Sequence, residues 1–380
     1  MRSRPLVAAL SAVAAAVSSV LLLAAPASAA PVAVSCGDVV TTDAYLAADA
    51  ACAGVGITLV GDVTLDLRGH ALDGDGSGAG ITVTLGSTQS VVDGTVSGWG
   101  SAVAHEQPDG GDPDDPVLFG DFTFTGVSFT GNGEVNDIGV GQLHGGSPVW
   151  FRYSGARFEG NGFVFRGPYG GTAVVEDSEL LHNGTVVSID TADVVIERSH
   201  LEGNDVVAGN LEESGLTVRD SVLRDNRVVY GGGNVMGHLD LEGSEVSGSD
   251  IVVGSGLIFT VRVVDNVLVD NDVALDLGTM SGPVTGNTFE RNRVALTAEG
   301  PPAGTGFPLS VVGNTFVGNG DAIVVDGGSG GTEIGDNVVH HNTGRGIHAP
   351  GVTDLGGNRA WANGVYPQCV GVVCAGKPRS

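Results

Sequence analysis

The chain has 380 residues, a formal net charge of −27 at neutral pH and a sequence pI near 4.3. So large an excess of acidic residues argues against binding to a nucleic-acid backbone through general electrostatics, but it is compatible with calcium or with a neutral or cationic partner. Glycine is abundant, aromatic residues make up 5% of the chain, and helical periodicity is nearly absent. This composition favours an all-β chain of short strands and tight turns.

The first 29 residues have the pattern of a secretory signal peptide. Arg2 and Arg4 form a positively charged start, an apolar run follows, and Pro26 precedes a small-residue cleavage site at 27–29. We therefore expect residues 1–29 to be removed and the mature protein to be secreted, with no contact to the membrane after cleavage. An uncleaved anchor is the alternative, because the apolar run is nearly long enough to cross a bilayer.

Four cysteines follow in two close pairs, one near each end of the mature chain. An even number of cysteines in an exported chain suggests disulfides, and we expect the pairs Cys36–Cys52 and Cys369–Cys374. Neither pair has the C-x-x-C spacing or the neighbouring histidines of a zinc site, so we expect no metal there.

A repeat of about 22 residues runs through most of the chain, and its clearest copy is VVDNVLVDN at 263–271. Each copy ends in a polar anchor residue, and apolar residues recur three and eight positions before it. So regular a period predicts a solenoid, in which the two apolar positions become stripes along the core. The anchors are Asn132, Asn161, Asn183, Asn204, Asn226, Asn271, Asn292, Asn319, Asn342 and Asn363, with Ser249 in the one missing slot.

The repeated asparagines are predicted to be structural rather than to bind a ligand. Asparagine tolerates the left-handed bend that a corner requires, and its amide can donate to one turn and accept from another. A second polar column stands five positions before the anchors. Its members are Ser178, Ser199, Ser221, Ser244, Asn266, Asn287, Asn314, Asn337 and Asn358.

The repeat also sets the expected domain boundaries. Residues 30–54 form an N-terminal cap or a first strand, residues 55–365 form the coil, and residues 366–380 form a tail closed by its own disulfide. Three stretches that interrupt the period are expected to leave the coil as loops: 104–121, 134–149 and 297–309.

A ladder of charged residues marks the outward side of one strand column. Glu176, Glu197, Arg219 and Glu242 stand seven positions before the anchor on four successive turns, and they are the candidate ligand-binding residues. A solvated charge ladder is the alternative. Glu176 and Glu197 would face each other at a backbone spacing close to the carboxyl separation of retaining glycosidases, so they are also a candidate acid and nucleophile.

Two further clusters contain titratable residues. The acidic loop with Asp109, Asp112, Asp114 and Asp115 is a candidate calcium site, although its spacing does not match a known ligand loop. The second cluster has two adjacent histidines, of which only one is expected to face outward, because neighbours on a strand point to opposite faces. It lacks a third metal ligand. Its members are His340, His341, Arg345 and His348.

Several segments carry a resemblance to a known family. They are N-T-F-x-x-N at 287–292 and 314–319, D-N-V-x-x-x-N at 336–342, and L-D-L-x-G-H-x-L-x-G at 65–74. In these segments the chain resembles the secreted right-handed parallel β-helix proteins of the pectate-lyase-like superfamily, and its units resemble the parallel β-helix repeat of NosD-type proteins. The resemblance implies a single-stranded right-handed parallel β-helix with roughly 22 residues per turn. It does not specify an activity, because the superfamily holds lyases, hydrolases, epimerases and proteins of other roles.

The catalytic signatures of these enzymes are incomplete here. The R-x-P-x-x-R signature of the lyases begins at Arg166, but Gly171 stands at its second arginine. The paired segments of the galacturonase-like hydrolases and the D-P-H-E segment of the epimerases are absent from the sequence. The remaining candidates for an arginine base on the coil are Arg198, Arg219 and Arg262.

The sequence therefore predicts a secreted, monomeric β-helix protein that binds polysaccharide or cell-wall glycan without catalysis. It predicts no nucleic-acid partner and no cofactor, although the composition is compatible with bound calcium. The alternative is a carbohydrate-active enzyme, either a polysaccharide lyase or a glycoside hydrolase, with its site on the outward face of the charged ladder.

Overall fold

The computed structural model describes residues 30–106, 119–137, 149–167, 170–231, 237–255, 260–301, 308–326 and 331–377. The predicted signal peptide and the candidate calcium loop lie outside the described residues. Contacts separate Met1–Ala30 from Pro31–Ser380, and all the strands of the described residues lie in the second unit.

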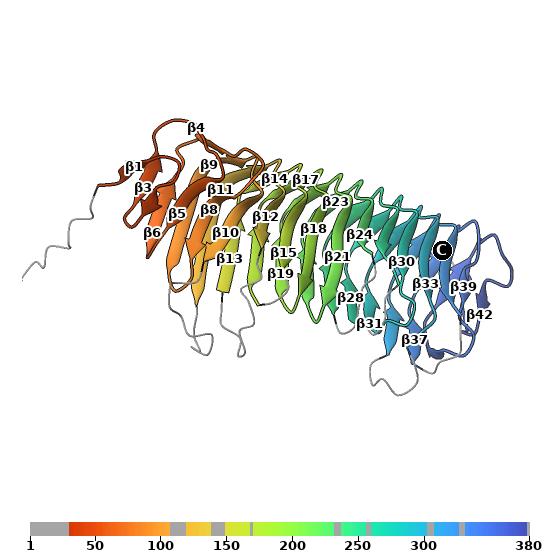
Figure 1. Cartoon of the computed structure of the whole chain (residues 1–380). Coiled ribbons are helices and arrows are strands. Elements are labelled where there is room, and N and C mark those ends of the chain that lie inside the picture. The colour runs from red at the N-terminus through yellow and green to blue at the C-terminus, as the bar shows by residue number, and fades with distance from the viewer. Residues whose placement is uncertain are drawn as a thin grey trace, which may run out of the picture. The chain divides into compact units, whose positions relative to one another are not determined.

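The unit Pro31–Ser380 is a parallel β-solenoid, as the repeat predicts, and its described residues contain strands but no helix (Figure 1). None of them therefore forms a helix that is long and apolar enough to span a bilayer. One turn consists of β25 (His238–Glu242), β26 (Glu245–Ser247) and β27 (Ile251–Val253), which are separated by tight corners. Each pairs in parallel with the strand one turn later, so the turns stack into three strand columns. The right-handed sense of the coil stays a prediction.

The first column, which we call face A, contains the charged ladder. Its strands are β1 (Val32–Val34), β3 (Ala44–Leu46), β6 (Val63–Asp66), β9 (Thr88–Ser97), β11 (Gly120–Thr130), β13 (Val149–Ser154), β16 (Thr172–Glu176), β19 (Asp193–Glu197), β22 (Gly215–Arg219), β25, β28 (Thr260–Val264), β31 (Gly282–Thr285), β34 (Leu309–Val312), β37 (Thr332–Gly335) and β40 (Thr353–Gly356).

The second column, face B, follows face A along every complete turn. The long strands β9 and β11 run through both faces and join them into one sheet of 27 strands. The other strands of face B are β4 (Ala50–Ala51), β7 (Ala71–Asp73), β14 (Arg157–Glu159), β17 (Glu179–Leu181), β20 (His200–Glu202), β23 (Val222–Arg224), β26, β29 (Val267–Val269), β32 (Thr288–Glu290), β35 (Thr315–Val317), β38 (Val338–His340) and β41 (Arg359–Trp361).

The third column, face C, is a separate sheet of 15 strands and lies at the front in Figure 1. Its strands are β2 (Val39–Val40), β5 (Val55–Leu59), β8 (Ala79–Thr84), β10 (Ser101–Glu106), β12 (Glu134–Asp137), β15 (Phe163–Gly167), β18 (Thr185–Asp190), β21 (Val206–Glu212), β24 (Val228–Tyr230), β27, β30 (Val273–Asp276), β33 (Val294–Ala298), β36 (Asp321–Val325), β39 (Ile347–His348) and β42 (Cys369–Val370).

The predicted loops are shorter than their sequence ranges. The strands β10, β12 and β33 continue into the first residues of 104–121, 134–149 and 297–309 respectively, because these residues still pair with at least one neighbouring turn. The interiors of the three ranges lie outside the described residues.

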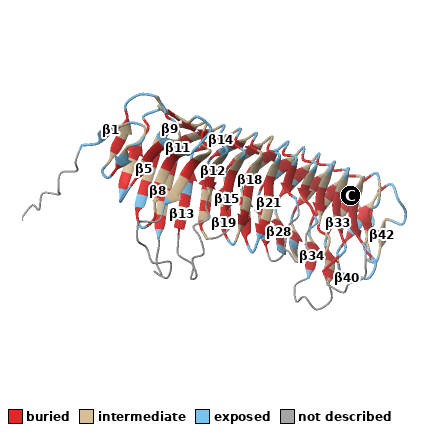
Figure 2. Ribbon diagram, viewed as in Figure 1, coloured by how far each residue is buried: buried red, intermediate tan, exposed pale blue. Residues whose placement is uncertain are grey.

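The core of the coil lies between the three faces and is filled by the predicted apolar columns (Figure 2). Val263 and Leu268 from the clearest repeat are fully buried. The prediction is wrong at Leu355, which is 53% exposed. The register shifts between Ile334 and Gly335, so that Asp354 rather than Leu355 lies opposite Ile334.

Aromatic rings fill the core near β11 and β13. Phe124 stacks on Tyr153 with ring centroids 4.8 Å apart, and Phe129 stacks on Phe158 at 5.4 Å. The buried Tyr153 hydroxyl accepts a hydrogen bond from Asn136 Nδ2 at 2.8 Å, while burial raises the pKa of Tyr153. The one hydroxyl in the predicted apolar columns is therefore satisfied inside the core.

The anchor asparagines form a hydrogen-bonded ladder along the corner between faces B and C. The backbone N–H and the Nδ2 of Asn271 both donate to Oδ1 of Asn292, each at 3.0 Å. Asn271 Nδ2 also donates to the carbonyl oxygen of Val246 at 3.1 Å. Buried amide groups of this kind are costly unless they are bonded, so each turn depends on its neighbour.

The prediction that the asparagines themselves adopt the left-handed bend is wrong. The positive φ lies one residue earlier, for example 57° at Asp270 before Asn271 and 56° at Asp265 before Asn266. Such a position suits aspartate or glycine, and it leaves the asparagine in an ordinary conformation with its amide directed along the ladder.

A gap interrupts the ladder at Ser249. Its backbone N–H still donates to Asn271 Oδ1 at 2.9 Å, but its buried Oγ has no hydrogen-bond partner among the described residues. The Ser249 side chain therefore does not connect with Asn226 on the preceding turn as an asparagine would.

Replacing Ser249 with asparagine is expected to stabilise the protein by about 1–3 kcal/mol, because an amide there would accept from Asn226 and donate to Asn271. Urea unfolding of Ser249→Asn against the unchanged protein measures this gain. A lower unfolding midpoint would show that the corner has no room for the longer side chain.

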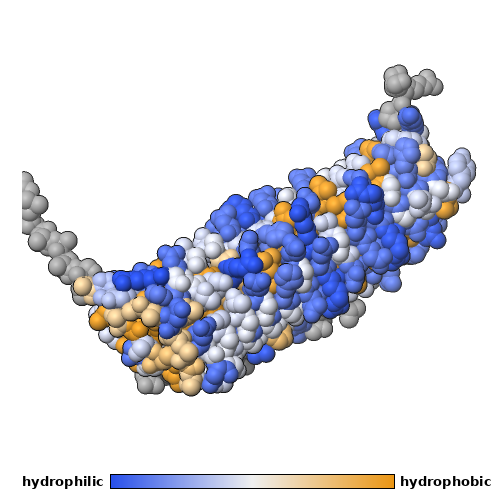
Figure 3. Space-filling view, turned by 90° about the horizontal axis from the view of Figure 1, so that it is seen from above, coloured by the Kyte–Doolittle hydropathy of each residue, from blue (hydrophilic) through white to orange (hydrophobic). Residues whose placement is uncertain are grey.

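The first turns are part of the coil. Residues 30–54, expected to be a cap or a first strand, contain β3 and β4, which pair in parallel with β6 and β7. The disulfide Cys36–Cys52 joins the first turn to the second. Seen from above, hydrophobic residues gather at this end of the coil, while the middle and the far end are mostly hydrophilic (Figure 3). Val39 is 63% exposed there.

The tail closes the other end of the coil. Gln368 Oε1 accepts hydrogen bonds from the backbone N–H and the Nδ2 of Asn363 at 2.8 and 2.9 Å, so it ends the ladder as a further asparagine would. The disulfide Cys369–Cys374 turns the chain back, and Ala375 bridges to Arg359 at the last strand of face B. This contact covers an edge that would otherwise present unpaired backbone groups.

Candidate functional site

The predicted charged ladder lies on face A in the expected register. Glu176 is opposite Glu197, Glu197 is opposite Arg219, and Arg219 is opposite Glu242, on the strands β16, β19, β22 and β25. The side chains are partly exposed, because each stands one position after a buried core residue on a strand whose residues alternate between the two sides.

Arg198 separates the like charges of Glu176 and Glu197. It occupies the bend after β19 with a φ of 49°. Its guanidinium donates to Glu176 at 2.9 Å and to Glu197 at 3.2 Å, and it also contacts Asp177 at 3.0 Å. The hydrogen bonds to Asp177 and to Glu176 raise the pKa of Arg198. The two carboxylates are therefore bridged by a cation.

A second group of ion pairs continues the ladder. Arg219 contacts Asp240 at 2.9 Å and Glu242 at 3.4 Å, and it also reaches Glu197 at 3.8 Å. Arg262 lies between Asp240 and Glu242, at 2.8 and 2.7 Å. We call these eight side chains the charged network: Glu176, Asp177, Glu197, Arg198, Arg219, Asp240, Glu242 and Arg262.

The charged network argues against the catalytic roles that the sequence left open. A lyase base has to lose its proton, but hydrogen bonds to carboxylates raise the pKa of Arg198, Arg219 and Arg262. A retaining glycosidase needs one free carboxylic acid near the glycosidic oxygen, whereas both carboxylates of the Glu176–Glu197 pair accept bonds from guanidinium groups.

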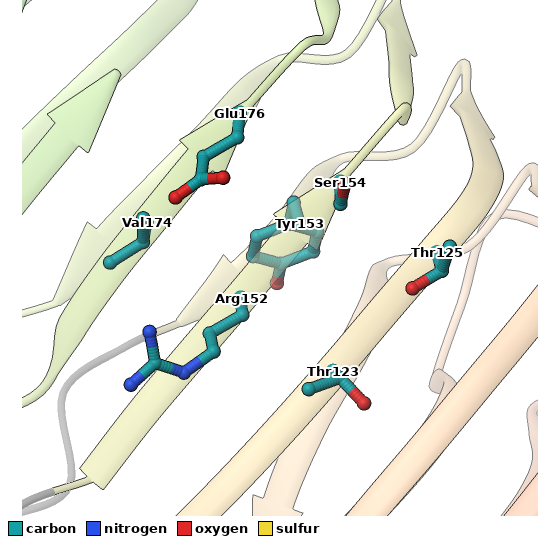
Figure 4. Close-up of a pocket in the computed structure, with 7 residues that line it drawn as sticks. All are labelled: Thr123, Thr125, Arg152, Tyr153, Ser154, Val174 and Glu176. Atoms are coloured by element: carbon teal, nitrogen blue, oxygen red, sulfur yellow. The ribbon is translucent and has the colours of Figure 1, made fainter. Parts of the chain in front are cut away.

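A groove of about 290 Å³ lies at the N-terminal end of the charged network (Figure 4). Three adjacent strands supply its walls: β11 provides two threonines, β13 provides Arg152 and Ser154, and β16 provides Val174 and Glu176. Its lining is therefore a mixture of hydroxyl groups, one cation, one carboxylate and an apolar floor. The full lining is Thr123, Thr125, Arg152, Tyr153, Ser154, Val174 and Glu176.

Trp150 lies beside this groove at the start of the same strand as Arg152. The Arg152 guanidinium stands over the Trp150 ring, 4.8 Å from its centroid, and its Nε donates to Asp121 at 3.2 Å. Two contacts from different residues hold the guanidinium in place, while the indole ring remains partly exposed. The groove is thus lined by a positioned hydrogen-bond donor, Arg152, whose guanidinium stands over the neighbouring indole ring.

A second groove of about 310 Å³ lies further along face A. It surrounds Asp240 and Arg262 of the charged network and is bordered by His238, Thr260 and Pro283. The centres of the two grooves are about five turns apart, which corresponds to roughly 24 Å at the usual strand spacing.

The histidine cluster differs from its prediction. His340 ends β38, and His341 occupies the following bend with a φ of 56°, so the two rings meet instead of pointing to opposite sides. Their Nδ1 atoms are 2.9 Å apart, and His340 stacks on Trp361 at 4.6 Å. Burial and the neighbouring His341 lower the pKa of His340. Within the described part of the chain, no three His, Cys, Asp or Glu side chains are placed to hold a metal ion.

Sequence reasoning located the column of Glu176 but not the groove beside it. Trp150 and Arg152 follow the stretch 134–149, which breaks the period, so counting from the anchors gives them no role. One signal was available. A tryptophan two residues before an arginine in a strand of alternating residues places both on the same outward side.

Comparison with known proteins assigns neither a family nor a function to the chain. No protein-family model matches the chain, and no curated protein sequence matches it. Among solved structures, the Dettilon tailspike protein (gp208) matches with 13% sequence identity and a TM-score of 0.26. The match covers 83% of this chain and 62% of the tailspike chain, so this chain spans less than two thirds of that protein. The function therefore has to be argued from the residues of the chain itself.

Proposed function

We propose that this protein is exported and binds a glycan chain along face A without cleaving it. The observation that carries the proposal is the groove beside Trp150, where a partly exposed aromatic ring lies next to a guanidinium held by Asp121 and to several hydroxyl groups. A sugar ring has apolar C–H faces and a rim of hydroxyls, so it matches an aromatic surface flanked by hydrogen-bond donors and acceptors.

Two features support export and binding over catalysis. The two disulfides are stable in an oxidising compartment, which fits secretion after removal of residues 1–29. The arginines and glutamates of the charged network are paired with each other, so they present a rigid polar surface rather than an acid or a base ready for proton transfer.

Replacing Trp150 or Arg152 with alanine is expected to weaken glycan binding at least tenfold, because aromatic and arginine anchors dominate most recognition surfaces. Titration calorimetry with neutral and uronate-containing polysaccharides measures the affinity. Arg224→Ala is the matched control, because Arg224 is a half-exposed arginine on face B that pairs with Glu245 at 3.4 Å. Equal losses in Arg152→Ala and Arg224→Ala would place the binding surface elsewhere.

The same polysaccharides test the enzyme alternative. Absorbance from unsaturated products and assays of reducing ends should stay at background, with or without calcium. Turnover that disappears in Glu176→Gln, Glu197→Gln or Arg219→Ala would overturn the non-catalytic proposal.

A further inference from the structure

Face C carries an aliphatic column on five successive turns. Val206, Val228, Ile251, Val273 and Val294 are aligned by the strand register from β21 to β33. Four of the five are partly exposed, although the next two residues of each strand are buried in the core. A row of partly exposed aliphatic side chains along a sheet is unusual for a surface that only meets water.

The aliphatic column has polar or aromatic neighbours at both ends. Going outward from Val206, the same column continues with Thr185 and Phe163, and outward from Val294 it continues with Asp321 and Arg345. The centre of the column is thus Ile251, with two valines on either side. An apolar centre with a polar rim is the usual composition of a protein interface.

The residues directly before the aliphatic column form a charged column. In chain order it reads Asp205, Arg227, Asp250, Asp272 and Arg293, and all five side chains are exposed. Counted outward from Asp250, the charges at equal distances have opposite signs. Arg227 corresponds to Asp272, and Asp205 corresponds to Arg293. Beyond these five residues the column contains glycine on the next two turns on either side. These are Gly184 and Gly162 on the N-terminal side, and Gly320 and Gly344 on the C-terminal side.

This antisymmetric order is what a two-fold axis along β27 requires. Consider a second copy placed face to face with the first, with its coil axis antiparallel. Each turn that follows β27 in one copy then lies on the turn that precedes β27 by the same number of turns in the other copy. Arg227 then meets Asp272 of the second copy, and Asp205 meets Arg293 of the second copy. The aliphatic columns superpose at the same time, with Ile251 against its own equivalent.

The existing ion pairs fit this arrangement. Within one chain Arg227 lies 3.9 Å from Asp205, and Arg293 Nη2 lies 3.0 Å from Asp272 Oδ2, with more than half of each side chain accessible. Each arginine can therefore keep the ion pair with the aspartate of its own chain and also donate a hydrogen bond to an aspartate across the interface. Only Asp250 would meet a like charge, that of its own equivalent.

We propose that face C, centred on Ile251, is the interface of an antiparallel homodimer. From β27 the sheet extends five strands to its end at β42, and in the other direction it continues past β12, the fifth strand, to β2. Two copies can therefore overlap over about 50 Å of the coil axis, which is long enough for an interface of ordinary size. This dimer replaces the monomer that the sequence predicted. It also keeps the glycan groove on face A of each copy outside the contact.

Cysteine cross-linking tests the position of the axis. All four cysteines of the chain are in disulfides, so an introduced thiol has no other partner. Under mild oxidation Ile251→Cys should form a covalent dimer, because the residue lies on the axis. Val294→Cys is the matched control on the same column. It should not cross-link, because the two copies of residue 294 would be about 19 Å apart. Equal cross-linking at both positions would overturn the proposed axis.

Charge inversion tests the pairing itself. The test variant carries Asp205→Arg, Arg227→Asp, Asp272→Arg and Arg293→Asp. It reverses the sign of these four charges and leaves Asp250 unchanged, so every pair of opposite charges is kept, both within a chain and between chains. Sedimentation velocity should show that it dimerises as the unchanged protein does, while mixtures of the two form few hybrids. Asp250→Asn should tighten the dimer severalfold. An unchanged protein that sediments as a monomer at all concentrations, or free formation of hybrids, would overturn the proposal.

Discussion

Asn292→Ala is expected to destabilise the coil by about 3–5 kcal/mol, the largest effect of a single substitution predicted here. Asn292 Nδ2 donates to Asn319 Oδ1 at 3.0 Å and to the Leu268 carbonyl oxygen at 2.9 Å. Its Oδ1 accepts two hydrogen bonds from Asn271 at 3.0 Å. Alanine removes these side-chain bonds and leaves the buried Asn271 backbone N–H and the buried Leu268 carbonyl oxygen without the partner that Asn292 supplies, which costs more than the bonds themselves stabilise.

Urea unfolding measures the total loss, and hydrogen exchange of the Asn271 amide measures it locally. Ser249→Ala is the matched control, because Ser249 occupies the same column but its Oγ has no partner among the described residues. This control should change stability by no more than about 0.5 kcal/mol. If Asn292→Ala and Ser249→Ala had similar effects, the ladder would not be a source of stability.

Removal of the Cys36–Cys52 disulfide is expected to cost about 3 kcal/mol, and removal of Cys369–Cys374 about 2 kcal/mol, because the first closes a longer loop than the second. The sequence separations are 16 and 5 residues. Each turn contacts mainly its neighbours, so the loss should be confined to the nearest turns.

Hydrogen exchange of the Cys36→Ser/Cys52→Ser protein measures this confinement. Amides of β3 and β5 should lose protection, while those of β19 and β22 in the middle of the coil should keep it. Simultaneous loss of protection along the whole chain would show that the coil unfolds as one cooperative unit and that the disulfide is not a local closure.

The asparagine ladder and the apolar core were predictable because their residues stand at fixed distances from the anchor residue in a repeat of nearly constant length. Val263, Leu268 and Asn271 recur at the same positions in almost every turn, and parallel strands in register place equal offsets in one column. The prediction that Leu355 is buried was wrong because it depended on the same offset. The strand register shifts there, so a residue at the usual offset from the anchor no longer lies in the core column, although the sequence pattern is unchanged.

The charged network was only partly predictable for a different reason. Counting places Glu176 opposite Glu197, which suggests a repulsive pair. The structure resolves the repulsion through Arg198, which belongs to another offset and reaches across the turn from a left-handed bend. Long side chains that cross between columns depend on backbone direction at the corners, and the repeat alone does not contain that information.

The gap in the asparagine ladder has a mechanical consequence. A force that pulls the two ends of the coil apart acts on all turns in series, so the weakest connection between turns determines where the coil breaks. At the step from Asn226 to Ser249 the serine side chain accepts no ladder bond, whereas Asn204 and Asn271 are each bonded to the next turn through their side chains. Under load the coil should part at this step, into one segment closed by the first disulfide and another closed by the tail.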